Sequence, residues 1–243
     1  GFLQVWRDGA IFDEFQNVPE LPSYLQWMVD ADPAPGRFIL TGSQHFALMN
    51  RVSQSLAGRT AVLHLLPFSL AELEGYAATE SLSATLLRGF FPRIHDRHLD
   101  PWDALGAYFA TYVERDLRQL TAVHDLQRFE RFVRLMAGRV GQILNLSNLA
   151  NDAGIAQPTA RAWLDLLQTS WIVFLLPPWF VNRGKRLIKS PKLYFSDVGL
   201  AARLLGLREE AQVARDPLYG ALFENLVVAE ALKWQLNAGD RAE

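Results

Sequence analysis

Short apolar runs alternate with helix-spaced apolar positions over residues 1–66. The runs predict strands at Ala10–Phe12, Arg37–Ser43 and Ala61–Leu66, and a further helix over residues 46–53. Between the first two strands, the spacing of one buried helix face is found at Leu21, Tyr24, Leu25, Met28 and Val29. Because strands alternate with helices, this part favours a parallel sheet covered on both faces.

The spacing becomes helical after residue 68. Helices are predicted over residues 70–76, 81–90, 102–120 and 126–137. Further along, two helices are predicted over 147–153 and 158–168, with Ser147 as the N-cap of the first. A strand over 171–176, a basic turn over 182–186 and a strand over 192–196 follow, and a helix over 217–236 comes last. Helix, turn, helix and two-stranded ribbon form the outline of a winged helix.

Composition places few limits on function. The 243 residues are 50% hydrophobic and 21% charged, with a net charge of −2, so the whole molecule gives no electrostatic argument for a nucleic-acid or membrane surface. Residues 139–192 differ, because they contain seven Lys or Arg against two acids. The absence of cysteine excludes disulfides and thiolate metal sites and fits a cytoplasmic protein. No apolar run reaches the roughly 18 residues of a membrane span.

Two adjacent carboxylates, Asp13 and Glu14, follow the first predicted strand. Two acids at the end of a buried strand need a positive partner or a metal, and open α/β sheets bind ligands at the carboxyl ends of their strands. Asp13 is therefore a candidate ligand of Mg²⁺, and Glu14 a candidate for orienting or deprotonating an attacking water. The alternative is that the pair caps the helix that begins near Pro19.

The second predicted strand ends in Thr41-Gly42-Ser43, which lies at the same edge of a parallel sheet as Asp13. A hydroxyl of Thr41 or Ser43 can there sense a γ-phosphate or hold the lytic water; ordinary turn chemistry is the alternative. Arg59 can supply positive charge to phosphates of its own site or of a neighbouring subunit. A surface arginine before a strand is the alternative for Arg59.

The order of several short motifs resembles a known family over nearly the full chain. The motifs are Ala10-Ile11-Phe12-Asp13-Glu14-Phe15-Gln16-Asn17-Val18-Pro19, Arg37-Phe38-Ile39-Leu40-Thr41-Gly42-Ser43, Ser55-Leu56-Ala57-Gly58-Arg59, Leu66-Pro67-Phe68-Ser69-Leu70, Lys189-Ser190-Pro191-Lys192-Leu193-Tyr194-Phe195-Ser196-Asp197-Val198-Gly199-Leu200 and Gly220-Ala221-Leu222-Phe223-Glu224-Asn225. They resemble prokaryotic predicted AAA+-type P-loop ATPases with an uncharacterised helical, winged-helix and nuclease-like C-terminal region.

The resemblance implies an α/β fold class, in which a partial AAA+-like P-loop sheet precedes a helical segment and a winged-helix domain. The parts would be 1–67 for the partial ATPase core, 68–138 for the helical segment, 139–207 for the winged helix and 208–243 for the start of a nuclease-like region. It also implies that Asp13 and Glu14 are the Walker B acids, that Thr41 or Ser43 is the sensor and that Arg59 is an arginine finger.

The resemblance further implies ATP and Mg²⁺ as cofactors of the full-length parent. No G-x-x-x-x-G-K-[ST] loop occurs in the 243 residues, although that loop supplies most of the phosphate contacts. We therefore expect both ends to be truncated, ATPase activity to belong to the parent, and the fragment itself to bind ATP poorly.

The winged-helix pattern contains the candidate nucleic-acid residues. Arg161 lies on the predicted second helix, and the basic residues around the turn would contact phosphates; these are Arg183, Lys185, Arg186 and Lys189. The alternative is a winged helix that serves as a protein–protein or lid module.

Three hypotheses therefore stay open. The parent is an ATP-driven switch that acts on nucleic acid or on a protein partner, or a DNA-binding module with a degenerate ATPase half, or a protein-interaction scaffold. An oligomer is compatible with all three hypotheses, and none involves a membrane.

Overall fold

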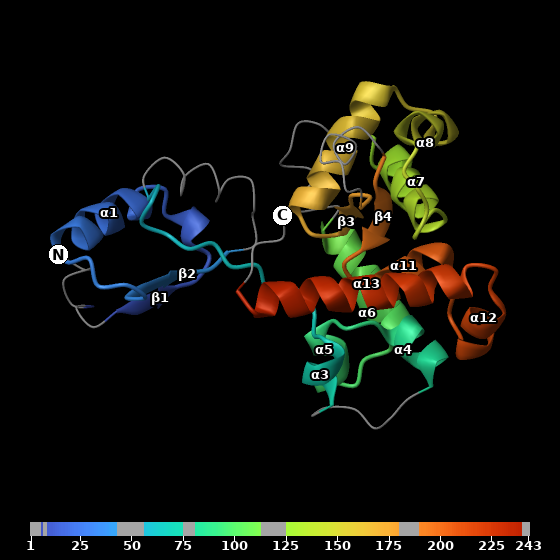
Figure 1. The fold of residues 1–243 in the computed structure, drawn as a ribbon, viewed down its shortest axis with the longest axis horizontal. Helices are drawn as coiled ribbons and strands as arrows, with labels where there is room; N and C mark the ends of the chain where they lie inside the picture. Colours follow the sequence, from blue (N-terminus) through green and yellow to red (C-terminus); the bar gives the residue numbers. More distant parts are fainter. Residues whose placement is uncertain are drawn as a thin grey trace. The chain divides into compact units, whose positions relative to one another are not determined.

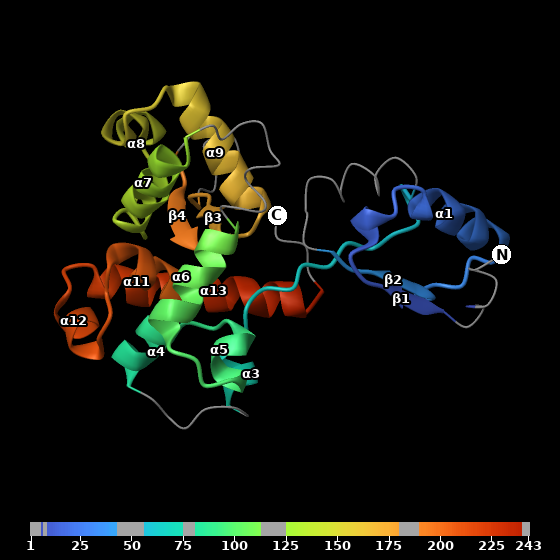
Figure 2. The ribbon, with the colours of Figure 1, turned by 180° about the vertical axis from the view of Figure 1, so that it is seen from behind.

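The computed structural model describes residues 6, 9–42, 56–74, 81–112, 125–179 and 190–239 (Figures 1 and 2). The chain divides into two compact units, Gly1–Leu63 and His64–Glu243. The two units are described separately below.

The first unit contains a strand–helix–strand arrangement. Strand β1 (Ala10–Phe12) precedes the short 3-10 helix η2 (Phe15–Asn17), helix α1 (Leu21–Ala31) and strand β2 (Phe38–Leu40). The strands pair in parallel, with Ile11 opposite Ile39. A helical crossover is needed because parallel strands cannot be joined by a tight turn. Two of the predicted strands, their parallel pairing and the helix between them are therefore confirmed.

The core of this unit lies on one face of the sheet. It consists of buried Phe15, Leu21, Leu25 and Leu56, against which Phe12, Phe38 and Leu40 pack. Tyr24, predicted to face this core, is 63% exposed, and the opposite sheet face leaves Ile11 68% and Ile39 52% exposed. Parallel sheets are normally covered on both faces, so among the described residues only one of the two expected layers is present.

The third predicted strand, Ala61–Leu66, is wrong. The structure has no strand over these residues, and Leu63 and Leu65 are 82% and 95% exposed. An apolar run becomes a strand only when a neighbouring edge accepts its hydrogen bonds, and no described strand does so here. The helix predicted over 46–53 lies outside the described residues.

The second unit is mainly helical. Its helices are α3 (Leu70–Leu73), α4 (Leu82–Arg88), α5 (Pro92–Asp96), α6 (Pro101–Tyr112), α7 (Leu126–Ala137), α8 (Leu146–Ala153), α9 (Gln157–Thr169), α11 (Val198–Leu205), α12 (Glu210–Arg215) and α13 (Tyr219–Asn237). In Figure 1 the long red helix α13 runs between the part formed by α8, α9, β3 and β4 and the part formed by α3, α4 and α5.

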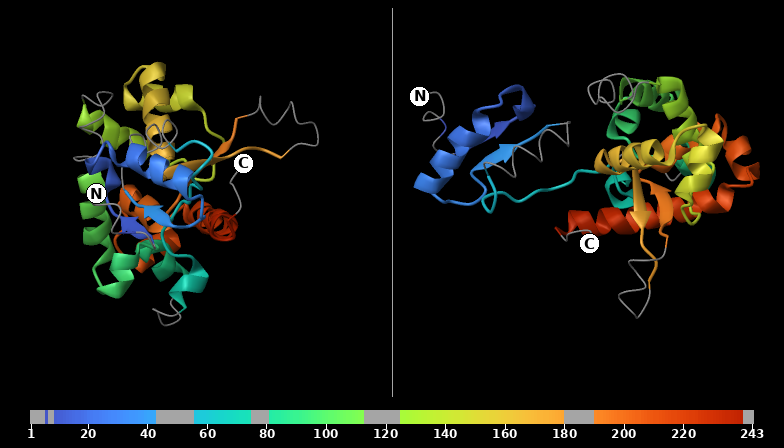
Figure 3. Two further views of the ribbon diagram at one scale, coloured as in Figure 1. Left: turned by 90° about the vertical axis from the view of Figure 1, so that its left-hand side faces the viewer. Right: turned by 90° about the horizontal axis from the view of Figure 1, so that it is seen from above.

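Strands β3 (Val173–Leu176) and β4 (Lys192–Phe195) form an antiparallel pair after α8 and α9, as Figure 3 shows. The predicted two-stranded ribbon is therefore present, although the turn predicted between its strands lies outside the described residues. The N-cap of α8 is Asn145, whose side chain accepts a hydrogen bond from the Asn148 N–H, and not the predicted Ser147.

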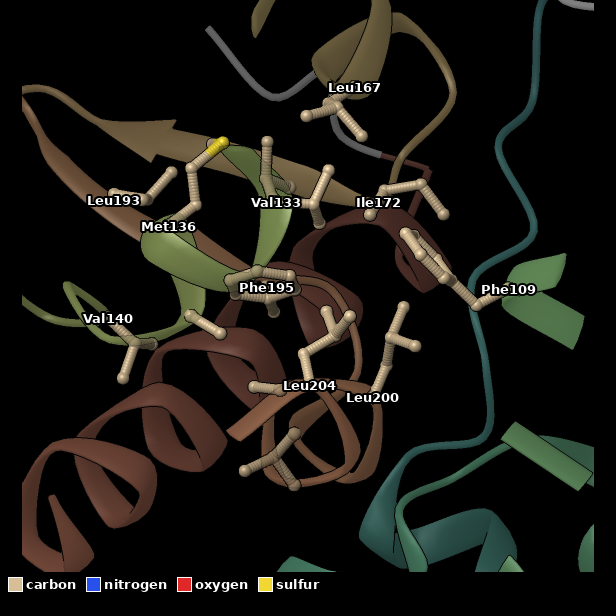
Figure 4. Packing of buried hydrophobic residues seen from close by; sticks show 14 of the residues in the cluster. Phe109, Val133, Met136, Val140, Leu167, Ile172, Leu193, Phe195, Leu200 and Leu204 are labelled. Carbon is tan, nitrogen blue, oxygen red and sulfur yellow. The ribbon is translucent and has the colours of Figure 1, made fainter. Parts of the chain in front are cut away.

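One hydrophobic core joins the helices to this ribbon. Figure 4 shows Val133 and Met136 of α7, Leu193 and Phe195 of β4, and Leu200 and Leu204 of α11 within one cluster of buried side chains. Trp163 of α9 is 2% exposed and meets the rings of Phe129 and Phe132 edge-on, with ring centroids 5.2 and 5.5 Å away. Edge-to-face pairs of this kind stabilise a core beyond their burial.

The described helices include none that is both long enough and apolar enough to cross a membrane.

Candidate functional site

The structure brings Asp13 and Thr41 together at the carboxyl ends of β1 and β2. The Thr41 hydroxyl donates a hydrogen bond to Asp13 Oδ1, which also accepts the Glu14 N–H at 3.0 Å. The backbone continues the pairing, because the Thr41 N–H donates to the Phe12 carbonyl at 2.9 Å and the Phe15 N–H to the Thr41 carbonyl at 3.2 Å. The two residues that the sequence places at one sheet edge are thus in direct contact.

Both carboxylates are exposed, so the expectation of two buried acids is wrong. Strand β1 is only three residues long, and Asp13 and Glu14 follow it in a turn that water reaches. Glu14 has a left-handed backbone, with φ 50° and ψ 42°, as it enters η2. Non-glycine residues adopt this conformation rarely, and it is concentrated at functional sites and tight turns.

Asp13 and Thr41 supply the chemical groups that a magnesium nucleotide uses. Mg²⁺ takes oxygen ligands, often one or two carboxylates together with phosphate oxygens and waters, and an exposed carboxylate beside a hydroxyl fits that set. In the described parts of the chain, no three His, Cys, Asp or Glu side chains gather closely enough to hold a metal by themselves.

Arg59 forms a bidentate ion pair with Asp30, which lies near the end of α1. Its Nε and Nη2 donate to the two carboxylate oxygens at 2.5 and 3.1 Å, and Nη1 donates to the Ala57 carbonyl at 3.2 Å. The hydrogen bond and charge of Asp30 raise the pKa of Arg59, against a small opposing effect of burial. A phosphate that reached Arg59 would have to replace Asp30.

Several predicted site residues cannot be placed. Ser43 and the basic residues Arg183, Lys185, Arg186 and Lys189 lie outside the described residues. Arg161 is exposed on α9, with Asp165 exposed one turn later. The exposed face of α9 thus pairs one positive with one negative charge, which gives phosphates little net attraction.

Sequence reasoning assigned no role to Asp197, which is fully buried at the start of α11. Its Oδ1 accepts the Leu200 N–H at 2.8 Å and its Oδ2 accepts the Phe90 N–H at 2.7 Å. Burial raises the pKa of Asp197, while the charge of Lys233 and these two hydrogen bonds act in the opposite direction. An aspartate directly before an apolar helical run is an N-cap signature, and that signal could have identified it.

Lys233 and His95 surround this aspartate. Lys233 is 1% exposed, donates to the Phe68 carbonyl at 2.7 Å and to Glu230 at 3.0 Å, and lies 4.0 Å from the Phe90 ring centroid. His95 is 5% exposed, and its Nε2 lies 2.9 Å from the Gly89 carbonyl. A polar cluster this deep ties α11, α13 and the segment between α4 and α5 together.

Glu224 is half-exposed on α13. Its Oε1 accepts from Lys192 Nζ at 2.7 Å and from the Tyr194 hydroxyl at 2.6 Å. Hydrogen bonds from Lys192 and Tyr194 lower the pKa of Glu224. The neighbouring Asn225 is fully buried and pairs with both backbone groups of Phe195, at 2.7 and 3.0 Å. These contacts attach α13 to β4.

Two different families match the two parts of the chain. Residues 79–211 match the family described as "Domain of unknown function (DUF8612)", which is more than half of the 243 residues. The chain belongs to this family. Residues 2–74 match an AAA domain. The DUF8612 part therefore includes α4 to α11, and the AAA-type part includes Asp13, Thr41 and Arg59.

Two curated relatives match 90% of this chain at 35% identity. They are "Uncharacterized protein Rv2008c" of Mycobacterium tuberculosis and "Uncharacterized protein Mb2031c" of Mycobacterium bovis. The aligned 220 residues are 49% of each relative, so the chain spans about half the length of the curated relatives it matches. No solved structure matches the chain.

Proposed function

We propose that the whole protein is an ATPase of the AAA type, which binds ATP with Mg²⁺ and hydrolyses it. The observation that carries this proposal is the contact between Asp13 and Thr41 at the carboxyl ends of two paired parallel strands. This is the edge at which open α/β sheets bind ligands. The match of residues 2–74 to an AAA domain supports the same conclusion.

In this proposal each residue has one role. Asp13 holds the Mg²⁺ of the nucleotide, and Glu14 orients or deprotonates the attacking water. Thr41, with Ser43 as the other candidate, senses the γ-phosphate. Arg59 acts as the arginine finger after it exchanges Asp30 for phosphate oxygens, in its own site or in that of a neighbouring subunit. The bound Mg²⁺ would supply charge neutralisation at the phosphates.

The activity is proposed for the whole protein. The loop G-x-x-x-x-G-K-[ST] does not occur among the 243 residues, and backbone N–H groups of such a loop hold the phosphates. We infer that the chain alone binds ATP weakly and does not turn it over.

The test is phosphate release by the whole protein with ATP and Mg²⁺. Glu14→Gln should retain nucleotide binding and lose hydrolysis by about a hundredfold or more, the usual contribution of a general base. Asp13→Asn should weaken the Mg²⁺-dependent binding of ATP. The matched control is Glu20→Gln, an exposed carboxylate of the same unit. Hydrolysis by both site variants at the rate of the control would contradict the proposal.

A second proposal concerns α8, α9 and the β3–β4 pair, whose order favours a winged helix that contacts DNA or a protein partner. A titration with DNA at two salt concentrations tests the DNA contact, comparing the chain with a variant in which Arg183, Lys185 and Arg186 are alanine. Unchanged affinity would argue for the protein-partner alternative.

A further inference from the structure

Four arginines lie on α7, on α11 and in the segment that follows α11. Arg131 and Arg134 are exposed three residues apart on α7, Arg203 lies on α11, and Arg208 lies three residues after the end of α11. Helix α7 packs on α11. Partial burial and then the charge of Arg134 lower the pKa of Arg203. We call Arg131, Arg134, Arg203 and Arg208 the arginine face.

Neighbouring residues position part of this face. The guanidinium carbon of Arg203 lies 3.4 Å from the ring centroid of Trp102, and that of Arg208 lies 4.2 Å from it. Arg203 Nε also donates to the Trp102 carbonyl at 2.8 Å. Gly106 leaves the necessary room, because a Cβ there would lie 2.8 Å from Arg203 Nη2. A cation stacked on tryptophan is held in a defined direction, so the positive groups are pre-arranged.

The positive charges of the face are not neutralised within the described structure. Among the described residues, no carboxylate forms an ion pair with any of the four arginines, whereas Arg128 and Arg139 pair with Asp125 and Asp152. Partial burial, followed by the charges of Arg134 and Arg208, lowers the pKa of Arg203, and Asp103 only partly opposes this. Like charges held this close repel one another, and a bound anion would relieve the repulsion.

A hollow of about 580 Å³ adjoins Arg131 and Arg134. It is lined by Gln127, Glu130, Arg131, Arg134, Leu135, Gly138 and Arg139. Its volume far exceeds that of a single small anion, since a water molecule occupies about 30 Å³ in the liquid. The hollow and the stacked arginines together favour a ligand that carries several negative charges in a row.

The surface chemistry favours nucleic acid over an acidic protein segment. Protein interfaces depend on apolar and aromatic anchors at their centre, yet no large hydrophobic residue of the described α7 or α11 is exposed. Phosphate backbones need only repeated positive charge and hydrogen-bond donors. Arginine, with its planar fork of donors, is well suited to phosphate.

We propose that the arginine face of α7 and α11 binds the phosphate backbone of nucleic acid without reading its sequence. The face uses other residues than the proposed winged-helix contacts, and the proposal does not depend on the ATPase proposal. Affinity should fall with salt, because each phosphate contact releases condensed counterions.

The test uses the 243-residue chain and fluorescein-labelled duplex and single-stranded DNA, with anisotropy measured at about 50 and about 200 mM salt. Arg131→Ala with Arg134→Ala should weaken binding about tenfold at the lower salt. The affinity of the unchanged chain for duplex DNA falls between the lower and the higher salt concentration. For the double variant, which has two fewer phosphate contacts, the factor of this fall should be about ten times smaller. Arg208→Ala should act in the same direction.

The matched control is Arg93→Ala with Arg97→Ala, which removes the same charge from exposed positions of α5 and near its end. Equal weakening by this control would show a general charge effect and overturn the proposal. Failure of both DNA probes to bind would overturn it as well. Binding of poly-glutamate that depends on Arg131 and Arg134, without DNA binding, would assign the face to an acidic protein segment instead.

Discussion

Asp13 and Asp197 each follow a short strand, yet the structure uses them in opposite ways. Asp13 follows β1 and is exposed, and its carboxylate accepts the Thr41 hydroxyl and the next N–H. Asp197 comes two residues after β4, is fully buried, and accepts N–H groups from α11 and from Phe90. A residue type and a strand end are therefore not enough to distinguish a candidate ligand-binding acid from a structural one.

The difference depends on what surrounds each strand. The β1–β2 sheet is covered on one face only among the described residues, so water reaches its edge. The β4 strand is enclosed by α7, α11 and α13, and a carboxylate there must be compensated by donors and positive charge. Asp13 is accessible to water, as the proposed contact with a magnesium nucleotide requires, whereas the compensated Asp197 holds helices together.

The largest effect is expected from Asp197→Ala. The substitution leaves the buried Phe90 and Leu200 N–H groups without an acceptor. Each buried donor left unsatisfied costs about 1 to 3 kcal/mol, so the two together should cost about 2 to 6 kcal/mol. Urea unfolding followed by circular dichroism measures this cost. The control is Asp165→Ala at an exposed position, which should change stability by no more than about 0.5 kcal/mol. A change that small for Asp197→Ala would show that Asp197 has no structural role.

A glycine pair tests how closely α11 approaches the segment before α5. A Cβ on Gly199 would lie 2.6 Å from the Gly89 backbone, which cannot move aside like a side chain. Alanine normally stabilises a helix by about 1 kcal/mol over glycine, but this overlap should reverse the sign and destabilise the protein by about 1 to 3 kcal/mol.

Gly220→Ala on α13 is the matched control for Gly199→Ala. No atom lies within 4 Å of its added Cβ, so it should raise the unfolding free energy by up to about 1 kcal/mol. Thermal unfolding of both variants gives the comparison. Stabilisation by Gly199→Ala would disprove the close contact between the two backbones.

The pH dependence should differ between Glu224 and Asp197. Lys192 and Tyr194 lower the pKa of Glu224 in the folded state. Its stabilisation is therefore present above the ordinary glutamate value of about 4.3 and lost as pH falls through the lowered folded value. Because Glu224 is half-exposed, the effect should be no more than about 1 kcal/mol.

Unfolding free energies of the chain and of Glu224→Gln, measured near neutral and acidic pH, test this sign. The difference between the two proteins should shrink on acidification. Burial raises the pKa of Asp197 in the folded state. The free energy of unfolding should therefore increase as pH falls through that raised value, which is opposite in sign to the effect of Glu224. A difference that is independent of pH would exclude the Glu224 cluster as its source.

The smallest effect on stability is expected from Thr41→Val. Because this contact is exposed to solvent, losing the hydrogen bond from the Thr41 hydroxyl to Asp13 should change stability by no more than about 0.5 kcal/mol. In the whole protein the same change should reduce ATP hydrolysis, since Thr41 is the proposed sensor. If Thr41→Val hydrolyses ATP normally but is clearly less stable, the Asp13–Thr41 contact has a structural role, as the contacts of Asp197 do.

The sequence could predict elements whose signals are local. Helix α7 begins and ends where its 3.6-residue spacing predicts, and the parallel β1–β2 pair brings Asp13 to Thr41 as the strand–helix–strand pattern indicates. Ala61–Leu66 failed because strand formation depends on a pairing edge elsewhere in space. Trp179 is 77% exposed, which its apolar side chain alone does not predict.

By itself, the sequence determined the alternation of elements, the placement of Asp13 and Thr41 at one sheet edge and the helix–turn–helix–ribbon order, because these depend on spacing along the chain. Only the tertiary structure decided that Asp13 is exposed and Asp197 buried, that Arg59 pairs with Asp30, and that arginines far apart in the sequence lie on neighbouring helices. Burial and charge compensation depend on which segments meet in space, and that is a property of the packed chain.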